Sequence, residues 1–539
     1  MKKCSLVLFF FLVLCLGMQA QEETFSVLVH NRTHLQTREE YSQKVLFPVK
    51  DKKIKDITLD FSLNCPEKKC SDWDYSISIL LRPNNSKATY QLGRMITPYS
   101  GWYNQGENAS KWDYHLQWNI TEYLPLMKDS VEIIVSYEGY QDGFLASTNF
   151  IFTQYSQKEK ATQFLETKNI YFGYYPFGRE DSSINEFLPE KTISIPKGTK
   201  QVLARMTVSG HGGDRINAAA EFLEKSYTYV VNGKEVSTQS VWRDDCGCNP
   251  IQPQGGTWIY NRSGWCPGTK VNEYYYDLTP FIKDNKLNIN LFFEYYNGQN
   301  SGEAGYQIAN DLFFIGDKNY KHREILEERE FKLEPIVLPK EFILVFKTNN
   351  EARNKWYIQR EDTLKTKLYE RSQFETNKIY ANKIRLEDKE SYILRIIDED
   401  CDGLSWWANP NQGDGYVLIY DKDSTELLYA FEPDFGCQIY QPFVVRDENI
   451  RHKDNNLVAL QDKEKKEFRI IFFCKEGEKD ALSITIKNRK TGEEVYNQVF
   501  DSKNKHDINI DCKDFEKGYY QAKITCNGWT EYKMYRNLD

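Results

Sequence analysis

Two acidic residues, Asp74 and Glu138, stand at the ends of predicted strands, on the face that points away from the core. The core faces are defined by Tyr75, Ile77 and Ile79 in one strand and by Val131, Ile133, Val135 and Tyr137 in the other. Where a cleft forms beside them, such carboxylates can take up or supply a proton during hydrolysis. A carboxylate at a strand end is ordinarily solvated or caps a turn, so the alternation of side chains along the strand alone favours a structural role.

The loop before Asp74 carries two cysteines: residues 65–74 read Cys-Pro-Glu-Lys-Lys-Cys-Ser-Asp-Trp-Asp. This short spacing favours a disulfide between Cys65 and Cys70, which would make the loop that delivers Asp74 rigid. Cys246, Cys248 and Cys266 are crowded into a second loop, where we expect Cys246 and Cys266 to be disulfide-bonded. The pairing stays open for Cys248, Cys401, Cys437, Cys474, Cys512 and Cys526.

The composition argues against several classes of protein. The net charge of -8 and the pI near 5.7 argue against a nucleic-acid partner, because such proteins need a basic surface to displace counterions. The 36 tyrosines and 11 tryptophans favour carbohydrate, since flat rings suit the apolar faces of sugars. Seven scattered histidines and the lack of a paired CxxC argue against zinc, and we expect no cofactor.

The chain begins with a predicted secretory signal peptide at residues 1–20. An apolar run at 6–16 follows Lys2 and Lys3 and precedes a small-residue site, with cleavage expected after Ala20. The run is too short to span a bilayer, and no later stretch approaches that length. A lipid anchor on Cys15 is the disfavoured alternative. We therefore expect an exported chain that keeps its disulfides oxidised.

Apolar and polar residues alternate with a period of two through most of the chain, which predicts an all-β fold of antiparallel sandwiches. A polar stretch at 156–167 and a charged stretch at 318–330 divide this pattern. We place β-rich units at residues 22–155, 163–317, 335–450 and 460–539, with a hairpin turn at 488–492 in the last unit.

Three blocks, the third of which has two parts, resemble one known family. After residues 65–74 come Gly-Arg-Met-Ile-Thr-Pro-Tyr at 93–99, Cys-Gly-Cys-Asn-Pro at 246–250 and Asn-Arg-Ser-Gly-Trp-Cys-Pro-Gly at 261–268. In this order they closely resemble the bacterial peptide-N-glycosidase F family across about residues 22–317. The resemblance implies two adjacent eight-stranded antiparallel jelly-roll domains with the active site in the cleft between them, followed by accessory β-sandwich domains.

The resemblance also implies roles for single residues. Asp74 falls on the principal catalytic carboxylate, Glu138 on a second acidic residue and Glu221 on a third carboxylate. The remaining positions are expected to bind substrate: Tyr140 as an aromatic contact, Ile96 as an apolar contact, Arg262 and Trp265 near the glycan, and Ser71 and Gly213 beside the first GlcNAc. A packing role for Trp265 beside Cys266 stays an alternative, and His211 is interpreted as a loop residue.

The sequence departs from the family at several of these positions. The family disulfide beside the third carboxylate is missing, since Ala219 and Leu223 stand where cysteines would be. Tyr75 follows Asp74 in place of an arginine. Ser71 and Gly213 replace an acidic residue and a histidine, which predicts space beside the first GlcNAc and tolerance of a core α1,3-fucose.

The activity that the resemblance implies is hydrolysis of the β-aspartylglucosylamine amide of N-glycosylated proteins and glycopeptides. Amide hydrolysis needs an activated water, a proton for the leaving nitrogen and stabilisation of the oxyanion. Asp74 would act on water or on the nitrogen, Glu138 and Glu221 would orient water and sugar hydroxyls, and Arg262 would steady negative charge. We expect a monomer in the periplasm, at the surface or in the medium of a Gram-negative bacterium. A glycoside hydrolase and a non-catalytic glycan-binding or adhesin-like protein are the alternatives.

The C-terminal part carries one metal-like pattern. Asp398, Asp400, Asp402 and Gly403 resemble the start of a calcium loop, but position twelve is Asn409 and not a bidentate acid. A solvated acidic turn is the alternative. Trp406 and Trp407 would bind sugar or, alternatively, pack inside a small sandwich.

Overall fold

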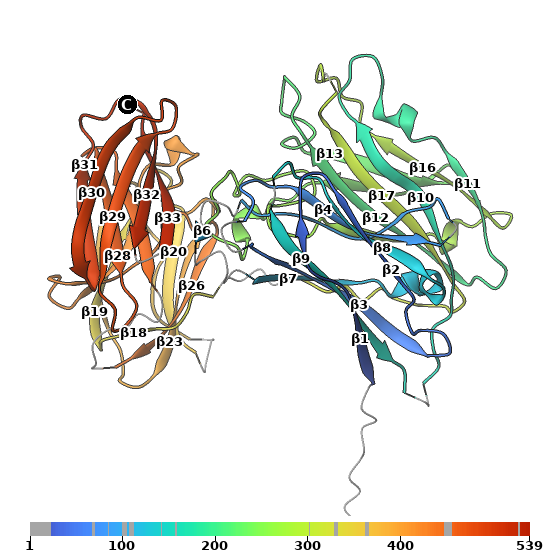
Figure 1. Ribbon diagram of the computed structural model, residues 1–539, viewed down its shortest axis with the longest axis horizontal. Coiled ribbons are helices and arrows are strands. Elements are labelled where there is room, and N and C mark those ends of the chain that lie inside the picture. Colours follow the sequence, from blue (N-terminus) through green and yellow to red (C-terminus); the bar gives the residue numbers. More distant parts are fainter. Residues whose placement is uncertain are drawn as a thin grey trace, which may run out of the picture.

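The computed structural model describes residues 23–66, 70–84, 86–99, 105–106, 113–141, 143–156, 159–300, 302–327, 332–361, 366–446, 455–526 and 529–538. The predicted signal peptide lies outside the described residues. The strands form two lobes, one from the N-terminal part and one from the C-terminal part of the chain (Figure 1). The predicted all-β, antiparallel fold is confirmed, with one parallel pairing among the named strands, between β18 and β26.

The first sandwich has eight strands in two sheets that enclose one apolar core. One sheet has the order β1 (Thr24–Leu35), β9 (Phe144–Gln154), β3 (Ile54–Asn64) and β7 (Asp113–Asn119). The facing sheet has the order β2 (Glu40–Val45), β8 (Val131–Tyr137), β4 (Ser76–Pro83) and β5 (Tyr90–Ile96), and the 3-10 helix η2 (Thr121–Lys128) closes one end.

The second sandwich also has eight strands around its own core. One sheet has the order β10 (Phe164–Pro176), β17 (Gly305–Ile315), β12 (Gln201–His211) and β15 (Glu273–Asp277). The other has the order β11 (Lys191–Ser194), β16 (Lys286–Phe293), β13 (Lys225–Val231) and β14 (Lys234–Val241). Short 3-10 helices lie in its loops: η3 (Ile184–Phe187), η4 (Cys246–Cys248) and η5 (Thr279–Phe281).

The C-terminal lobe contains two more pairs of sheets with separate cores. One sheet of the third sandwich has the order β18 (Ile336–Leu338), β26 (Gln438–Val445), β23 (Ser391–Asp398), β20 (Asn354–Arg360) and β21 (Lys367–Arg371). Its other sheet has the order β22 (Ile379–Arg385), β19 (Glu341–Lys347), β24 (Tyr416–Asp421) and β25 (Leu427–Ala430). The 3-10 helix η6 (Pro410–Gln412) lies between β23 and β24 in the chain. One sheet of the fourth sandwich has the order β27 (Asn456–Asp462), β28 (Glu467–Phe473) and β31 (Lys505–Asp511). Its other sheet has the order β30 (Glu494–Lys503), β29 (Asp480–Asn488), β32 (Gly518–Cys526), β33 (Trp529–Asn537) and β6 (Gln105–Gly106). The predicted hairpin turn at 488–492 joins β29 to β30.

The first two sandwiches pack against each other through the sheet that contains β4 and β5. Arg205 of β12 donates hydrogen bonds to the carbonyls of Gln91 (2.5 Å) and Leu92 (3.0 Å). Arg94 of β5 donates to Ser209 Oγ at 2.8 Å in return. Both faces of β4 are therefore buried, its serine face included. The second sandwich covers the face of β4 that points away from the first core and carries the serines.

The cysteines form two separate disulfides and one crowded group. Cys65 is bonded to Cys70, and Cys246 to Cys266, in agreement with the expected pairs. The sulfurs of Cys248, Cys401 and Cys437 lie within 4.8 Å of one another, with Cys437 placed to bond either partner. In the described residues Cys474, Cys512 and Cys526 are buried thiols. No helix in this part of the chain is long and apolar enough to cross a membrane.

Candidate active site

The backbone on both sides of Asp74 is fixed by one threonine. Asp74 lies between the loop closed by the Cys65–Cys70 disulfide and the start of β4. Thr97, which follows β5, donates from Oγ1 to the carbonyl of Trp73 at 2.9 Å and accepts from the N–H of Tyr75 at 2.7 Å. The carboxylate is thus presented from a rigid position beside the second sandwich.

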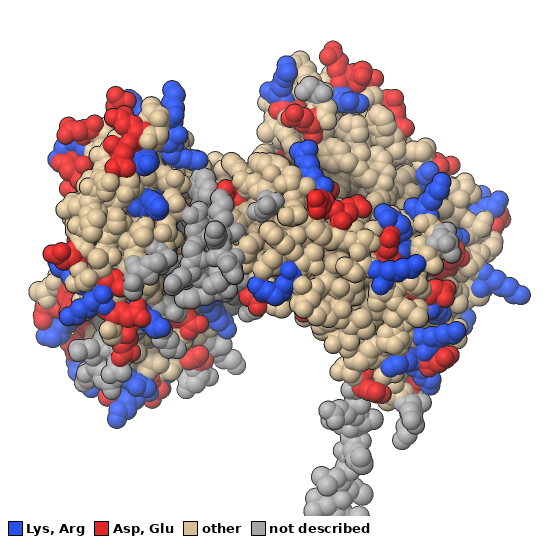
Figure 2. Space-filling model, viewed as in Figure 1, with Lys and Arg blue, Asp and Glu red and all other residues tan. Residues whose placement is uncertain are grey.

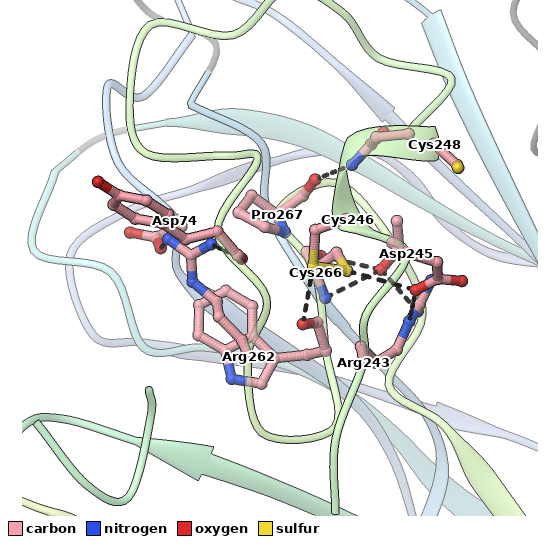
Figure 3. The surroundings of a disulfide bond; sticks show 12 residues. Asp74, Arg243, Asp245, Cys246, Cys248, Arg262, Cys266 and Pro267 are labelled. Atoms are coloured by element: carbon pink, nitrogen blue, oxygen red, sulfur yellow. Dashed lines mark hydrogen bonds and ion pairs between the residues drawn. A yellow bond between two sulfur atoms is a disulfide. The ribbon is translucent and has the colours of Figure 1, made fainter. Parts of the chain in front are cut away.

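Asp74, Tyr99, Arg262 and Glu221 form one group across the junction of the first two sandwiches. The Tyr99 hydroxyl donates to Asp74 Oδ2 at 2.6 Å, and Arg262 Nη2 lies 3.8 Å from the same oxygen. Arg262 Nε donates to Glu221 Oε1 at 3.1 Å. Figure 3 shows the guanidinium directed towards Asp74. The Asp74 and Glu221 side chains are 15% and 17% exposed, so water can reach both carboxylates.

Arg262 is fully buried, and each of its five N–H groups has an acceptor. Besides Glu221, these are the carbonyls of Thr257 and Tyr260 for Nη1, and the Tyr99 hydroxyl and Thr257 Oγ1 for Nη2. The guanidinium therefore acts on the carboxylates as a fixed positive charge. The expected place of Arg262 near the glycan stays a prediction, and in this structure all five of its N–H groups are already bonded within the protein.

Burial sets the protonation of the three acids. It raises the pKa of Asp74 to about 7; Arg262 opposes this rise, and the Glu221 carboxylate adds to it. Burial also raises the pKa of Glu221 and of Glu138, opposed by Arg262 and Arg94. A carboxyl group whose pKa lies near 7 exchanges protons readily at neutral pH, as a general acid or base must.

Glu138 follows β8 and belongs to the same junction without bonding to Asp74. Its Oε1 accepts from Gln307 Nε2 of the second sandwich at 3.1 Å. Tyr174 of β10 lies close enough to Glu138 and Glu221 to feel the charges of both. Burial and the charges of Glu138, Glu221 and Glu303 raise the pKa of Tyr174 to about 12. The structure thus joins Asp74 to Glu221 through Arg262 and places Glu138 at the same junction, bonded to Gln307.

The loop that carries Glu221 is held by hydrogen bonds. The N–H of Glu221 donates to the carbonyl of Gly212 at 3.1 Å, and the N–H of Ser263 donates to the carbonyl of Glu221 at 2.9 Å. Asp214 accepts from the N–H of Asn217 at 2.8 Å and from the hydroxyl of Tyr296 at 2.6 Å. These contacts hold the segment that a disulfide flanks in the family.

Exposed aromatic rings gather around the carboxylates. Trp73 precedes Asp74 and is 43% exposed, and Phe222 follows Glu221 and is 37% exposed. Tyr260 (42% exposed) lies with its ring edge-on to Phe222, and Tyr140 (55% exposed) lies edge-on to Tyr75. Large rings left in water beside polar groups are typical of carbohydrate sites. Tyr140 and Gly213 are accessible, as their expected roles require.

Three other residues expected to touch substrate are buried. Ile96 is 1% exposed, and Ser71 is fully buried and donates to Gln141 Oε1 at 3.0 Å. Trp265 is buried and donates from Nε1 to the Gly210 carbonyl at 2.8 Å, and the Arg262 guanidinium lies over the Trp265 ring. Their substrate contacts stay predictions, and the burial of Trp265 favours the packing alternative for that residue. His211, at the end of β12, stacks on the Trp265 ring.

The acidic segment of the C-terminal lobe is a structured turn. Asp398 accepts from the N–H groups of Asp402 (2.9 Å) and Gly403 (3.1 Å), and Asp402 accepts from Asn409 Nδ2 at 2.9 Å. Asp400 is paired with Arg353. Because protein donors occupy these carboxylates, the structure favours an acidic turn over a calcium loop. Trp406 is buried, which favours packing over sugar binding.

Sequence reasoning gave Tyr99 no role, although it lies in the second quoted block. Its ring lies against Gly256, where a Cβ would overlap the ring. The glycine pair at 255–256 was the signal that an aromatic ring lies close to the backbone.

A cavity of about 710 Å³, lined by residues such as Tyr275, Tyr320 and His322, lies elsewhere and includes none of the three carboxylates.

Fold and site define a protein of paired β-sandwiches with a carboxylate–arginine site at the junction of the first two. Residues 182–309 match the family model described as peptide-N-glycosidase F, C terminal. A relative from Elizabethkingia miricola, named peptide-N(4)-(N-acetyl-beta-D-glucosaminyl)asparagine amidase F, is 25% identical over 293 residues, which cover 51% of this chain and 77% of the relative. These two matches support a peptide-N-glycosidase F-like family for the part of the chain that they cover.

Two solved structures are also similar to the chain. PNGase F from Flavobacterium meningosepticum, described as a glycosylasparaginase, is 19% identical with a TM-score of 0.46, covering 54% of this chain and 96% of that one. PNGF-II is 17% identical with a TM-score of 0.40, covering 55% of this chain and 66% of that one.

Proposed function

We propose that this chain is an amidase that hydrolyses the bond between an asparagine side chain and the first GlcNAc of an N-linked glycan. The products are the glycan as a glycosylamine and a peptide with aspartate in place of asparagine. The family match and the name of the relative support this proposal. The observation that carries it is the pairing of Asp74 and Glu221 through one buried arginine at the junction of the two sandwiches.

In the proposed reaction Asp74, as a carboxylate, removes a proton from a water molecule that attacks the amide carbon. The C–O bond forms, and the charge that develops on the amide oxygen is stabilised by the fixed positive charge of Arg262. The protonated Asp74 then returns its proton to the nitrogen, and the C–N bond breaks. Glu138 and Glu221 orient the water and the sugar hydroxyls.

The exposed rings around the site fit a neutral carbohydrate. Trp73, Tyr140, Phe222 and Tyr260 offer flat apolar faces to sugar rings. On the face of the molecule in Figure 2, acidic and basic side chains are intermixed over both lobes. N-glycosylated proteins and glycopeptides are thus the proposed partners, and nucleic acid is not.

The test is the mass of the peptide after digestion of a defined N-glycopeptide. The amidase yields an aspartate peptide without sugar. A peptide that keeps one GlcNAc would identify a glycoside hydrolase, and saturable binding without any product would identify a glycan-binding protein. The acid–arginine group favours the amidase over the binding protein.

We also propose tolerance of a core α1,3-fucose, which rests on Gly213 alone. Gly213 is exposed and carries no side chain, whereas Ser71 is buried against Gln141 and opens no space. Release of an α1,3-fucosylated glycan at a rate close to that of its unfucosylated form is expected. Release of the unfucosylated form alone would contradict this.

Export as a monomer is the last part of the proposal. The disulfides Cys65–Cys70 and Cys246–Cys266 fit an oxidising compartment such as the periplasm, the cell surface or the medium. N-terminal sequencing of the protein from its native cell should begin at Gln21, and a retained Met1 would contradict export. Sedimentation should give one chain per particle.

A further inference from the structure

The C-terminal lobe is joined to the amidase lobe at the candidate site. Strand β6, from the segment between β5 and β7, pairs with the edge strand β33 between the two lobes (Figure 1). The N–H of Cys437 donates to the carbonyl of Gly247 at 2.8 Å, and Gly436 approaches Gly247 so closely that no Cβ fits. Such close backbone contact indicates a fixed junction.

A buried aromatic cluster fills the centre of this junction. It contains Tyr99 of the first sandwich, Trp258 and Ile259 of the second, and Trp406 of the third, and we call it the aromatic plug. Each of these side chains is buried, and Trp406 also lies edge-on to the ring of Tyr260, 4.8 Å between centroids. Three parts of the chain that are distant in sequence thus share one small core.

The aromatic plug touches the groups that hold the carboxylates. The hydroxyl of Tyr99 donates to Asp74, and the carbonyl of Tyr260 accepts from Arg262 Nη1 at 2.8 Å. On the far side, the backbone of Trp406 is itself held in place. The backbone N–H of Trp406 donates to Gln412 Oε1 at 2.7 Å, and Arg536 of β33 donates to the Trp406 carbonyl. A displacement of Trp406 would therefore reach both Asp74 and Arg262.

We propose that Trp406, from the C-terminal lobe, is a positioning residue of the amidase site, acting through Tyr99 on Asp74 and through Tyr260 on Arg262. The proposal rests on the proposed function for its kinetic readout. It makes the C-terminal lobe a structural part of the active site. Its physical basis is that a misplacement of about 1 Å in a catalytic group can cost roughly 100-fold in rate.

Loss of the Trp406 ring has a second consequence. A cavity opens in the cluster that contains Tyr99, and water that enters the cluster hydrates Asp74, so the pKa of Asp74 falls towards its ordinary range. The charged and titratable groups that face Asp74 are Arg262, Glu221 and Tyr99, and the substitution removes none of them. A lower pKa would therefore report the loss of packing.

The test compares Trp406→Ala with Trp356→Ala, using Trp406→Phe as the conservative variant. Trp356 of β20 is 2% exposed in the core of the same sandwich but is not part of the aromatic plug, so it controls for loss of stability. For Trp406→Ala we expect kcat on a glycopeptide to fall roughly 10- to 100-fold, with KM changed much less and the pH profile moved to lower pH. Trp356→Ala should keep the wild-type kcat and pH profile, and Trp406→Phe should recover most of kcat.

Titration of Asp74 separates this inference from the proposed function. The carboxyl is followed by isotope-edited infrared spectroscopy as the difference between each protein and its Asp74→Asn form, without substrate. A lower pKa in Trp406→Ala, and not in Trp356→Ala, supports the inference even if the wild-type chain releases no glycan. Equal profiles in all folded variants overturn it. Should Trp406→Ala fail to fold, Trp406→Leu takes its place with the same outcomes.

Discussion

The hydroxyl of Tyr99 donates a 2.6 Å hydrogen bond to Oδ2 of Asp74, while the Tyr99 ring lies on Gly256 of the second sandwich. The carboxylate of one sandwich is therefore held by a side chain that the other sandwich supports. This relationship explains how residues from two sandwiches form one site at their junction.

Tyr99→Phe removes that donor. Because the hydrogen bond lowers the pKa of Asp74, its loss should raise this pKa above about 7 and move the pH profile of kcat/KM to higher pH. Trp406→Ala should move it the other way. Tyr420→Phe, in the distant strand β24, serves as the control, and a Tyr99→Phe profile identical to that of the control would contradict the hydrogen bond.

Arg262→Lys leaves at least two of the five acceptors around the guanidinium without a donor, because an ammonium group has three N–H bonds. Disruption of a buried ion pair of this kind costs about 3–5 kcal/mol of the free energy of unfolding. Denaturant titration measures the loss. Arg469→Lys, whose pair with Asp507 is partly exposed, should change stability by less than about 1 kcal/mol. Equal effects of the two substitutions would contradict the central place of Arg262.

The raised pKa of Asp74 also affects stability. In the unfolded chain the carboxyl releases its proton near its ordinary value of 3.8, but in the folded protein it does so near 7. Between these values the folded state binds more protons, so the Asp74 contribution to stability is full below pH 3.8 and is lost as the pH rises to 7. Asp74→Asn should therefore gain stability relative to the wild type between about pH 4 and 7. A difference in unfolding free energy that stays constant over this window would show that the pKa is not raised.

The group of Cys248, Cys401 and Cys437 has a simple chemical constraint. Cys437 can bond only one of its two neighbours, so one thiol of the three stays free. Peptide mapping under non-reducing conditions should find Cys437 linked to Cys248 or to Cys401, with Cys65–Cys70 and Cys246–Cys266 intact. A link from Cys437 to Cys474, Cys512 or Cys526 would contradict the structure.

Local pattern was sufficient to predict the strands and the position of Asp74. Alternating burial of Ile57, Leu59, Phe61 and Leu63 follows directly from the sequence, and so does the placement of Asp74 off the core of its own sandwich. Parity describes one strand relative to its own core. It carries no information on whether a second sandwich covers the other face, so the burial of Ser76 and Ser78 could not be predicted from it.

Long-range contacts decided the rest of the site. The resemblance named Arg262, Trp265, Ser71 and Ile96 but not their accessibility, which depends on how loops from two sandwiches close over them. Glu221 lies in a loop, where alternation along a strand gives no information, and this loop is held by Gly212 and Ser263, which are far apart in sequence. The contribution of Trp406 lay beyond reach, because nothing local in 404–415 indicates that Trp406 joins a buried cluster with Tyr99.

The central claim is that Asp74 directs water to the side-chain amide of a glycosylated asparagine. A defined glycopeptide is digested in heavy-oxygen water by the wild-type protein and by Asp74→Asn, and the peptide product is weighed by mass spectrometry. We predict one heavy oxygen in the new aspartate with the wild type, and a rate at least about 100-fold lower with the folded variant. An unlabelled peptide, or equal release by the two proteins, would contradict the claim.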